Sequence, residues 1–212
     1  METNQLDVKK HVNGHVNENI DSSQLSEPEA ISEKLCIQKN YQMIVTEEQL
    51  DIWLEKLKGA DLLAVDTETT SLDYMEAELV GISFAIAAGQ AIYIPFGHDY
   101  LGAPKQLAKD LVMTKLKPIL ENPNSKKVGQ NLKYDMSVLA QHGIFLAGIE
   151  FDTMLESYVV DSVATRHDMD SLAEKYLDEI TTKFTDIAGK GVGQLTFNQV
   201  ALEHAAPYAS ED

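Results

Sequence analysis

The stretch LLAVDTETTSL, residues 62–72, decides how the rest of the chain is interpreted. Its short apolar run, Leu62–Val65, ends at the acids Asp66 and Glu68, which predicts a buried strand that reaches the edge of a core. Because side chains alternate along a strand, the two carboxylates point the same way. At about 4 Å and an effective dielectric near 20, their repulsion is on the order of 4 kcal/mol.

This pair of acids has two interpretations. A shared proton or a divalent cation neutralises them, and Mg²⁺ and Mn²⁺ prefer oxygen ligands of this kind. Alternatively, they are two solvated acids where a strand enters a turn. The pair alone does not decide, so the choice depends on the rest of the chain.

The composition fits one domain with a tail: 212 residues, of which 44% are hydrophobic and 24% charged. The single cysteine, Cys36, excludes an internal disulfide and fits a reducing compartment. The first residues lack the pattern of a signal peptide. A formal net charge of −17 argues against a broad basic surface for nucleic acid, but not against a protein that reaches phosphates through bound metal ions.

Residues 1–40 contain no aromatic side chain and are mostly polar, which predicts a disordered or linker tail before a domain at 41–212. Residues 79–96 are long and apolar enough to resemble a membrane span. Their β-branched side chains and the interruption at residues 87–90 favour two strands joined by a tight turn instead, so no membrane is expected.

Local patterns predict an α/β fold. Thr46 and Gln49 have the spacing of a capping box before an amphipathic helix with Trp53 on its inner side. Three strands follow, and their connections are too short for crossover helices, so they are expected to be antiparallel neighbours. They are placed at 61–68, 79–86 and 91–96.

Helices then alternate with a further strand. A helix is expected at 104–120, with proline at its start. The later elements are a strand at 126–129, helices at 153–161 and 168–177, a glycine-rich loop at 187–191 and a last helix from 198. Asp152 is expected to cap the helix at 153–161. The whole pattern predicts a mixed sheet, three antiparallel strands and then parallel strands, flanked by helices.

A further acid faces inward in the segment VGQNLKYDMSVL, residues 128–139. Asn131 is expected to cap a helix whose apolar stripe is Leu132, Met136 and Leu139. Asp135 then lies on the buried side, which is costly unless it is paired or coordinates metal. A hydrogen bond to nearby backbone is the alternative.

The final segment reads AAPYASED, in which Tyr208 and Asp212 are four residues apart and share a helix face. Ala205 falls on the same face and allows close approach to a sheet. Pro207 predicts a kink or a restart of the helix near Ala206.

Four acids on three separated segments, together with a tyrosine, resemble the 3′–5′ proofreading exonuclease domain of bacterial DNA polymerase I, a family with a ribonuclease-H-like fold. Residues 66–68 (DTE) look like its first motif, 131–135 (NLKYD) its second and 208–212 (YASED) its third. VGQNLKYD, FDTMLESY, RHDMDSLAEKY and IAGKG followed by QLTFNQ also look like this family, in that order. The likeness covers residues 41–212.

The resemblance implies roles for eleven residues. Four would ligate two divalent ions, Mg²⁺ or Mn²⁺: Asp66, Glu68, Asp135 and Asp212. Tyr208 would orient the attacking water. Six would contact the DNA strand or support the site, with packing or local hydrogen bonding as the alternative: Leu72 and Phe184, which look like the residues that pack on terminal bases, and Gln130, Asn131, Tyr134 and Arg166.

The implied function is proofreading removal of nucleotides from single-stranded or mispaired DNA 3′ ends, in replication and repair. The implied partners are DNA and a polymerase domain C-terminal in the same chain, in a monomer of the bacterial cytoplasm. Because the family's sequence continues past Asp212, a chain ending there is expected to bind metal more weakly than an extended one. The alternatives are a catalytically silent scaffold for a polymerase domain and a related RNA 3′-end exonuclease.

Overall fold

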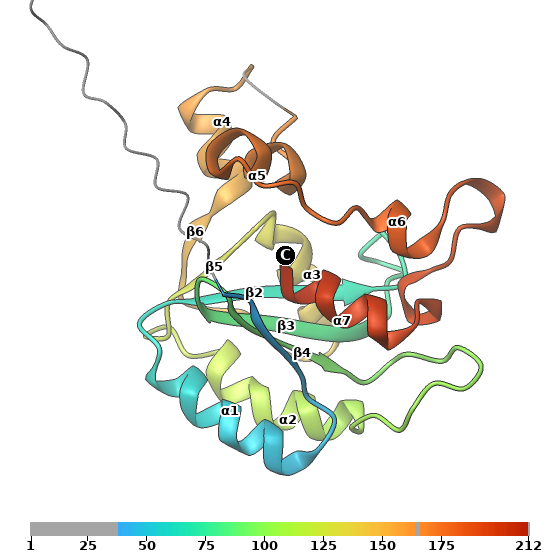
Figure 1. The fold of residues 1–212 in the computed structure, drawn as a ribbon. Helices are drawn as coiled ribbons and strands as arrows, with labels where there is room; N and C mark the ends of the chain where they lie inside the picture. The colour runs from blue at the N-terminus through green and yellow to red at the C-terminus, as the bar shows by residue number, and fades with distance from the viewer. Residues whose placement is uncertain (1–37, 164–165, 212) are drawn as a thin grey trace, which may run out of the picture. The chain divides into compact units, whose positions relative to one another are not determined.

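The computed structural model describes residues 38–163 and 166–211, which form a six-stranded mixed sheet with helices packed on it (Figure 1). The predicted tail, residues 1–40, lies outside the described residues except for its last three. The strands are β1 (Asn40–Met43), β2 (Leu63–Thr69), β3 (Leu79–Ala87), β4 (Gln90–Pro95), β5 (Lys127–Gly129) and β6 (Ile149–Asp152). The helices are α1 (Glu47–Gly59), α2 (Lys109–Leu120), α3 (Leu132–Gln141), α4 (Thr153–Val160), α5 (Met169–Leu177), α6 (Phe184–Ala188) and α7 (Leu202–Glu211).

The strand order is β1-β4-β3-β2-β5-β6, and the predicted mixed sheet is confirmed. Strands β2, β3 and β4 are antiparallel neighbours. Strands β5 and β6 continue the sheet in parallel from β2, and β1 is parallel to β4 at the other edge. The long apolar run at 79–96 is the β3–β4 hairpin, and none of the described helices is long and apolar enough to cross a membrane.

Alternation along β2 places its side chains on the two faces of the sheet. Leu63 and Val65 belong to the larger cluster, to which α1, α2 and α3 contribute their inner faces. Trp53 is 3% exposed within it, and the predicted capping box at Thr46 is present. Helix α7 packs on the opposite face of the sheet from α1 and α2, where Ala205 is fully buried in the smaller cluster (Figure 1). Asp66 and Glu68 have the opposite parity to Val65 and therefore face the α7 side.

Two predicted helix starts are wrong. Helix α2 begins at Lys109, five residues after Pro104, because Gln106 is held by the backbone of His98: its amide nitrogen donates to the carbonyl of His98 and its oxygen accepts from the N–H. The last helix does not begin near Asn198 either. A 3₁₀ turn at Phe197–Gln199 precedes α7.

Helix α7 runs through Pro207 without the restart predicted near Ala206. Proline removes one backbone donor from a helix, and at Pro207, which is exposed to solvent, this loss does not end α7. The relation between Tyr208 and the sheet is therefore set by one unbroken helix. The expected loop at 187–191 begins inside a helix, since α6 ends at Ala188.

Candidate active site

One groove of about 1410 Å³ collects the acids that the sequence singled out. Asp66 and Glu68 reach it from β2, Asp135 from α3 and Tyr208 from α7. Asp212 lies outside the described residues. All the described members of the predicted catalytic set thus line one groove, although they are separated by up to 142 positions in the sequence.

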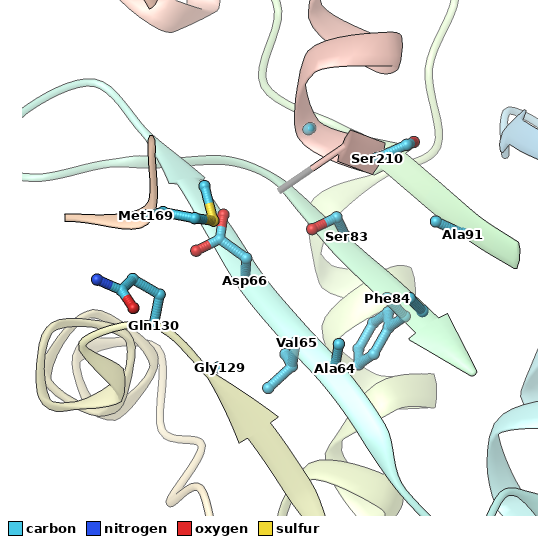
Figure 2. A pocket seen from close by; sticks show the side chains of 12 residues that line it. Ala64, Val65, Asp66, Ser83, Phe84, Ala91, Gly129, Gln130, Met169 and Ser210 are labelled. Carbon is cyan, nitrogen blue, oxygen red and sulfur yellow. The ribbon is translucent and has the colours of Figure 1, made fainter. Parts of the chain in front are cut away.

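The two acids of β2 share a face of the sheet, as the alternation predicts. Glu68 is 8% exposed, whereas Asp66 is half-buried. Figure 2 shows Asp66 projecting from β2 between Met169 and Ser83, beside a smaller hollow floored by the sheet. The pair is therefore not two fully solvated acids at a turn, because one of them is buried.

Asp135 is 2% exposed, so its predicted place on the buried side of the helix is confirmed. Its Oδ1 accepts two hydrogen bonds from Thr67, one from the backbone N–H at 3.0 Å and one from the hydroxyl at 2.5 Å. Burial raises the pKa of Asp135 to about 6, and the bonds from Thr67 act against that rise. A carboxylate in this position would be stabilised by a cation.

The start of α3 is held by a residue from another element. Asn131 occupies the capping position with a left-handed backbone (φ 57°), but its side chain makes no capping bond, so the predicted Asn131 cap is wrong. Asp152, at the end of β6, accepts from the N–H of Asn131 at 3.2 Å and of Leu132 at 2.9 Å. A carboxylate at a helix N-terminus also suits the helix dipole.

Asp152 caps α4 as well, as predicted. It accepts from the N–H of Met154 and Leu155, both at 3.1 Å. One carboxylate therefore binds four backbone donors and joins the start of α3, which carries Asp135, to the start of α4. The stripe of α3 also differs from the prediction: Met136 is 41% exposed, and Val138 takes the buried place.

Tyr208 belongs to an aromatic cluster at the base of α7. Its ring centroid lies 5.9 Å from that of Phe197 and 6.3 Å from that of Phe184. Phe184 in turn stacks on Phe197 at 6.3 Å. Both aromatic neighbours thus fix the direction of the phenol, so Phe184 supports Tyr208 in addition to lining the groove.

A buried polar chain stands behind this cluster. Nδ1 of His98 donates to the carbonyl of Val200 at 3.0 Å, which leaves Nε2 to accept from the hydroxyl of Tyr93 at 2.8 Å. Val200 is two residues before α7. These two hydrogen bonds connect the segment before α7 to β4.

The six residues expected to contact DNA all line the groove, but several are engaged within the protein. The hydroxyl of Tyr134 donates to the carbonyl of Ser71 and bonds to Thr69. Gln130 donates to the carbonyl of His167 at 2.7 Å. Leu72 is 97% exposed on the groove wall.

Arg166 is also exposed, and its guanidinium pairs with Asp168 at 3.2 Å. An exposed arginine with one exposed acid partner remains accessible to a phosphate. For Gln130 and Tyr134, local hydrogen bonding accounts for the side chain without a ligand.

Sequence patterns did not indicate Thr67, Phe197 or the second role of Asp152. Thr67 stands between two acids but points to the other face of the strand, so only its tertiary partner reveals a role. Phe197 carries no local signal that separates it from a core residue. Asp152 carried a visible signal as a helix cap, but nothing local indicated the second helix.

The side chains of the groove supply carboxylate oxygens, the donors that Mg²⁺ and Mn²⁺ prefer. Within residues 38–163 and 166–211, no three His, Cys, Asp or Glu side chains form a ready group for a metal ion. The fourth implied ligand, Asp212, lies outside these ranges. The buried carboxylate of Asp135, with its raised pKa, fits the neighbourhood of a cation.

Known proteins of one family match most of the chain. The family described as 3′–5′ exonuclease matches residues 41–212. DNA polymerase I of Pseudomonas aeruginosa is 55% identical over 175 residues, which are 82% of this chain and 19% of that protein. DNA polymerase I of Rhizobium leguminosarum is 41% identical over 180 residues, 77% of this chain and 18% of that protein.

Solved structures show the same fold at low identity. RNase D of Trypanosoma brucei is 16% identical with a TM-score of 0.66. The match covers 83% of this chain and 61% of the RNase D chain. NrnC of Brucella melitensis with bound Mg²⁺ is 22% identical with a TM-score of 0.50, covering 81% and 74%. The matched family and the fold together give the class, which is 3′–5′ exonuclease domains with a ribonuclease-H-like mixed sheet.

The chain belongs to the 3′–5′ exonuclease domain family of bacterial DNA polymerase I. It spans about a fifth of the length of these polymerases.

Proposed function

We propose that this chain is a proofreading module that hydrolyses the terminal phosphodiester bond at single-stranded or mispaired DNA 3′ ends. The observation that carries the proposal is the meeting of Asp66, Glu68, Asp135 and Tyr208 in one groove, from three elements distant in sequence. Identity to DNA polymerases I over most of the chain supports DNA as the substrate.

Asp66, Glu68, Asp135 and Asp212 would hold two divalent ions, Mg²⁺ or Mn²⁺. When bound, such ions supply an activated water and stabilise the charge that develops on the phosphate. Four carboxylates balance the charge of two such ions. The bound Mg²⁺ of NrnC, a protein of the same fold, supports the choice of ion.

The chain's own residues position the reactants. The hydroxyl of Tyr208, whose ring is braced by Phe184 and Phe197, orients the attacking water by hydrogen bonding. Leu72 and Phe184 pack on the unstacked terminal bases, a contact that tolerates any sequence. Arg166 binds a backbone phosphate. A mispaired end unpairs more readily and therefore reaches the groove more often.

The wider assignments follow from the relatives. Residues 41–212 form the exonuclease domain, and a polymerase domain C-terminal to it belongs to the same polypeptide, as the length of the relatives suggests. The protein acts as a monomer in the bacterial cytoplasm.

Two other functions are the alternatives to DNA proofreading. A silent scaffold would not need the acids and Tyr208, all of which are present. An RNA exonuclease has support from the fold, because RNase D shares it, but that likeness is 16% in sequence against 55% for a DNA polymerase. DNA proofreading is therefore favoured.

The test is cleavage of 5′-labelled DNA and RNA oligonucleotides in Mg²⁺ and in Mn²⁺. We expect Asp66→Ala and Asp135→Ala to lower the rate on single-stranded DNA by at least about 100-fold, with circular dichroism showing that the fold persists. Asp61→Ala, at an exposed position just before β2, is the matched control and keeps full activity.

Undiminished cleavage by either active-site variant contradicts the mechanism. If the unchanged protein cleaves neither oligonucleotide in Mg²⁺ or in Mn²⁺, that result supports the silent scaffold instead. A preference for the RNA oligonucleotide supports the RNA exonuclease.

A further inference from the structure

Thr67 lies between the two acids of β2 but does not share their face. Its side chain is 6% exposed, and its parity matches that of Val65, which belongs to the larger hydrophobic cluster. A buried threonine in a strand is ordinarily explained by β propensity. Here its hydroxyl has a specific partner in Asp135, 68 positions away in the sequence.

The backbone N–H of Thr67 also binds Asp135. Strand β5 pairs with β2 only at Leu63 and Ala64, so the edge of β2 beyond that point has no strand beside it on this side. Helix α3 covers that edge, and Asp135 takes the Thr67 N–H that a neighbouring strand would otherwise bind.

Both bonds from Thr67 end on the same oxygen. Two donors from one residue fix the position of Oδ1 and the rotation of the carboxylate about it. Oδ2 takes neither bond. Since Asp135 lines the groove together with Asp66 and Glu68, holding Oδ1 leaves Oδ2 as the oxygen available to a ligand there.

We propose that Thr67 is the positioning residue for Asp135: its hydroxyl clamps Oδ1 so that Oδ2 is presented to a divalent ion shared with the acids of β2. The inference rests on the proposed metal-dependent function. It assigns to the central residue of the Asp66–Glu68 segment a task that the two acids do not perform. Residues that orient metal ligands in this way typically contribute about 10–100-fold in metal affinity.

Three substitutions distinguish a role of the Thr67 hydroxyl in positioning Asp135 from a role of the side chain in packing. Thr67→Val keeps the branched shape and removes the hydroxyl. Thr67→Ser keeps the hydroxyl and removes the methyl group. Thr67→Ala removes both groups, and it replaces Thr67→Val in the test if the Thr67→Val protein does not fold. Thr114→Val, at an exposed position of α2, is the matched control.

The measurement is Mn²⁺ binding to the metal-free full chain, followed by the electron paramagnetic resonance signal of free Mn²⁺. We expect Thr67→Val to bind Mn²⁺ about 10-fold or more weakly, Thr67→Ser to remain within about threefold of the unchanged protein, and the control to match it. Raising Mn²⁺ should restore the cleavage rate of Thr67→Val, because the ligand remains present but misdirected.

A packing role gives the reverse order, with Val close to the unchanged protein and Ser impaired, and that order overturns the inference. So does equal Mn²⁺ affinity of the Ala and Ser variants. If the unchanged protein cleaves DNA and binds Mn²⁺ but Thr67→Val behaves identically, only this inference fails. If the unchanged protein does neither, the proposed function itself fails.

Discussion

The two sides of the groove are built in different ways. The sheet body, β1–β4 with α1 and α2, is held by apolar burial: α1 buries four side chains and α2 buries five. The α4–α5 arm, which is residues 153–163 and 166–177, buries almost nothing. Helix α4 has Ser157 as its only buried residue, and α5 has none.

Polar contacts, and not an apolar core, hold the α4–α5 arm against the rest of the structure. The ring of His167 bonds to the Ser157 hydroxyl at 2.8 Å and stacks on Tyr158 with centroids 3.8 Å apart. Its carbonyl accepts from Gln130, at the end of β5. His167 adopts a left-handed backbone (φ 60°), a conformation that a non-glycine residue keeps only where its surroundings fix it.

Because of this difference, the acids are held rigidly while the wall of the groove beside them is not. The acids lie on elements of the sheet body or bonded to it, where their geometry is maintained by a core. The arm, which carries Arg166 and wall residues of the groove, has few apolar contacts and belongs to the low-stability part of the structure. Under the proposed function, a wall of this kind can open to admit a DNA strand without disturbing the acids.

The largest expected effect is at the junction of the two regions. Asp152→Asn removes the negative charge and replaces one of the two oxygens that bind four backbone donors, so a buried N–H at α3 or α4 loses its acceptor. We expect the free energy of unfolding to fall by about 2–3 kcal/mol, measured by urea denaturation.

The same change at Asp168, which caps α5 with one bond to Ser171, is the control. Asparagine is as good a cap there, so a loss below about 0.5 kcal/mol is expected. Equal losses at the two positions would show that Asp152 does not join the arm to the body.

A smaller and local effect is expected at His167. His167→Asn tolerates the left-handed backbone but loses the stacking on Tyr158 and the bond to Ser157. We expect amide hydrogen exchange in the arm to accelerate by an amount equivalent to about 1–2 kcal/mol, while β2–β4 stay protected.

His204→Ala, at an exposed position of α7, should change neither region. If exchange accelerates equally in β3 and in α4, arm and body open as one unit, and the contrast between them is wrong.

The smallest effect per measured step, here one pH unit, concerns the contact between β5 and the end of α2, away from the arm. Lys127 is fully buried, and its ammonium donates to the carbonyls of Ile119 and Asn122, where α2 ends. Burial lowers its pKa to about 8 from 10.5. The unfolded state therefore binds more protons between these values, so this group's contribution to stability rises with pH above about 8 and is lost as pH falls through 8.

We expect the stability of the unchanged protein to gain up to about 1 kcal/mol per pH unit in this range relative to Lys127→Met. Urea denaturation at pH 7.5, 8.5 and 9.5 measures the difference. Parallel curves for the two proteins would mean that Lys127 keeps an ordinary pKa.

Local patterns predicted much of the fold. The capping box at Thr46, the strand at Asp66 and the antiparallel order of β2, β3 and β4 all depend on neighbours within a few residues or on short connections. The failures arise where a group outside the local helical pattern intervenes. Gln106 binds His98 and delays α2, and Asp152 takes over the cap expected of Asn131.

The sequence by itself determined which acids are available and that Asp66 and Glu68 share a face, because alternation along a strand is a local property of the backbone. Only the tertiary structure decided that Asp135 meets Thr67 and that Tyr208 packs beside both Phe184 and Phe197. Those contacts join segments far apart in the chain, and their geometry is set by how helices pack against a sheet edge, which no local pattern encodes.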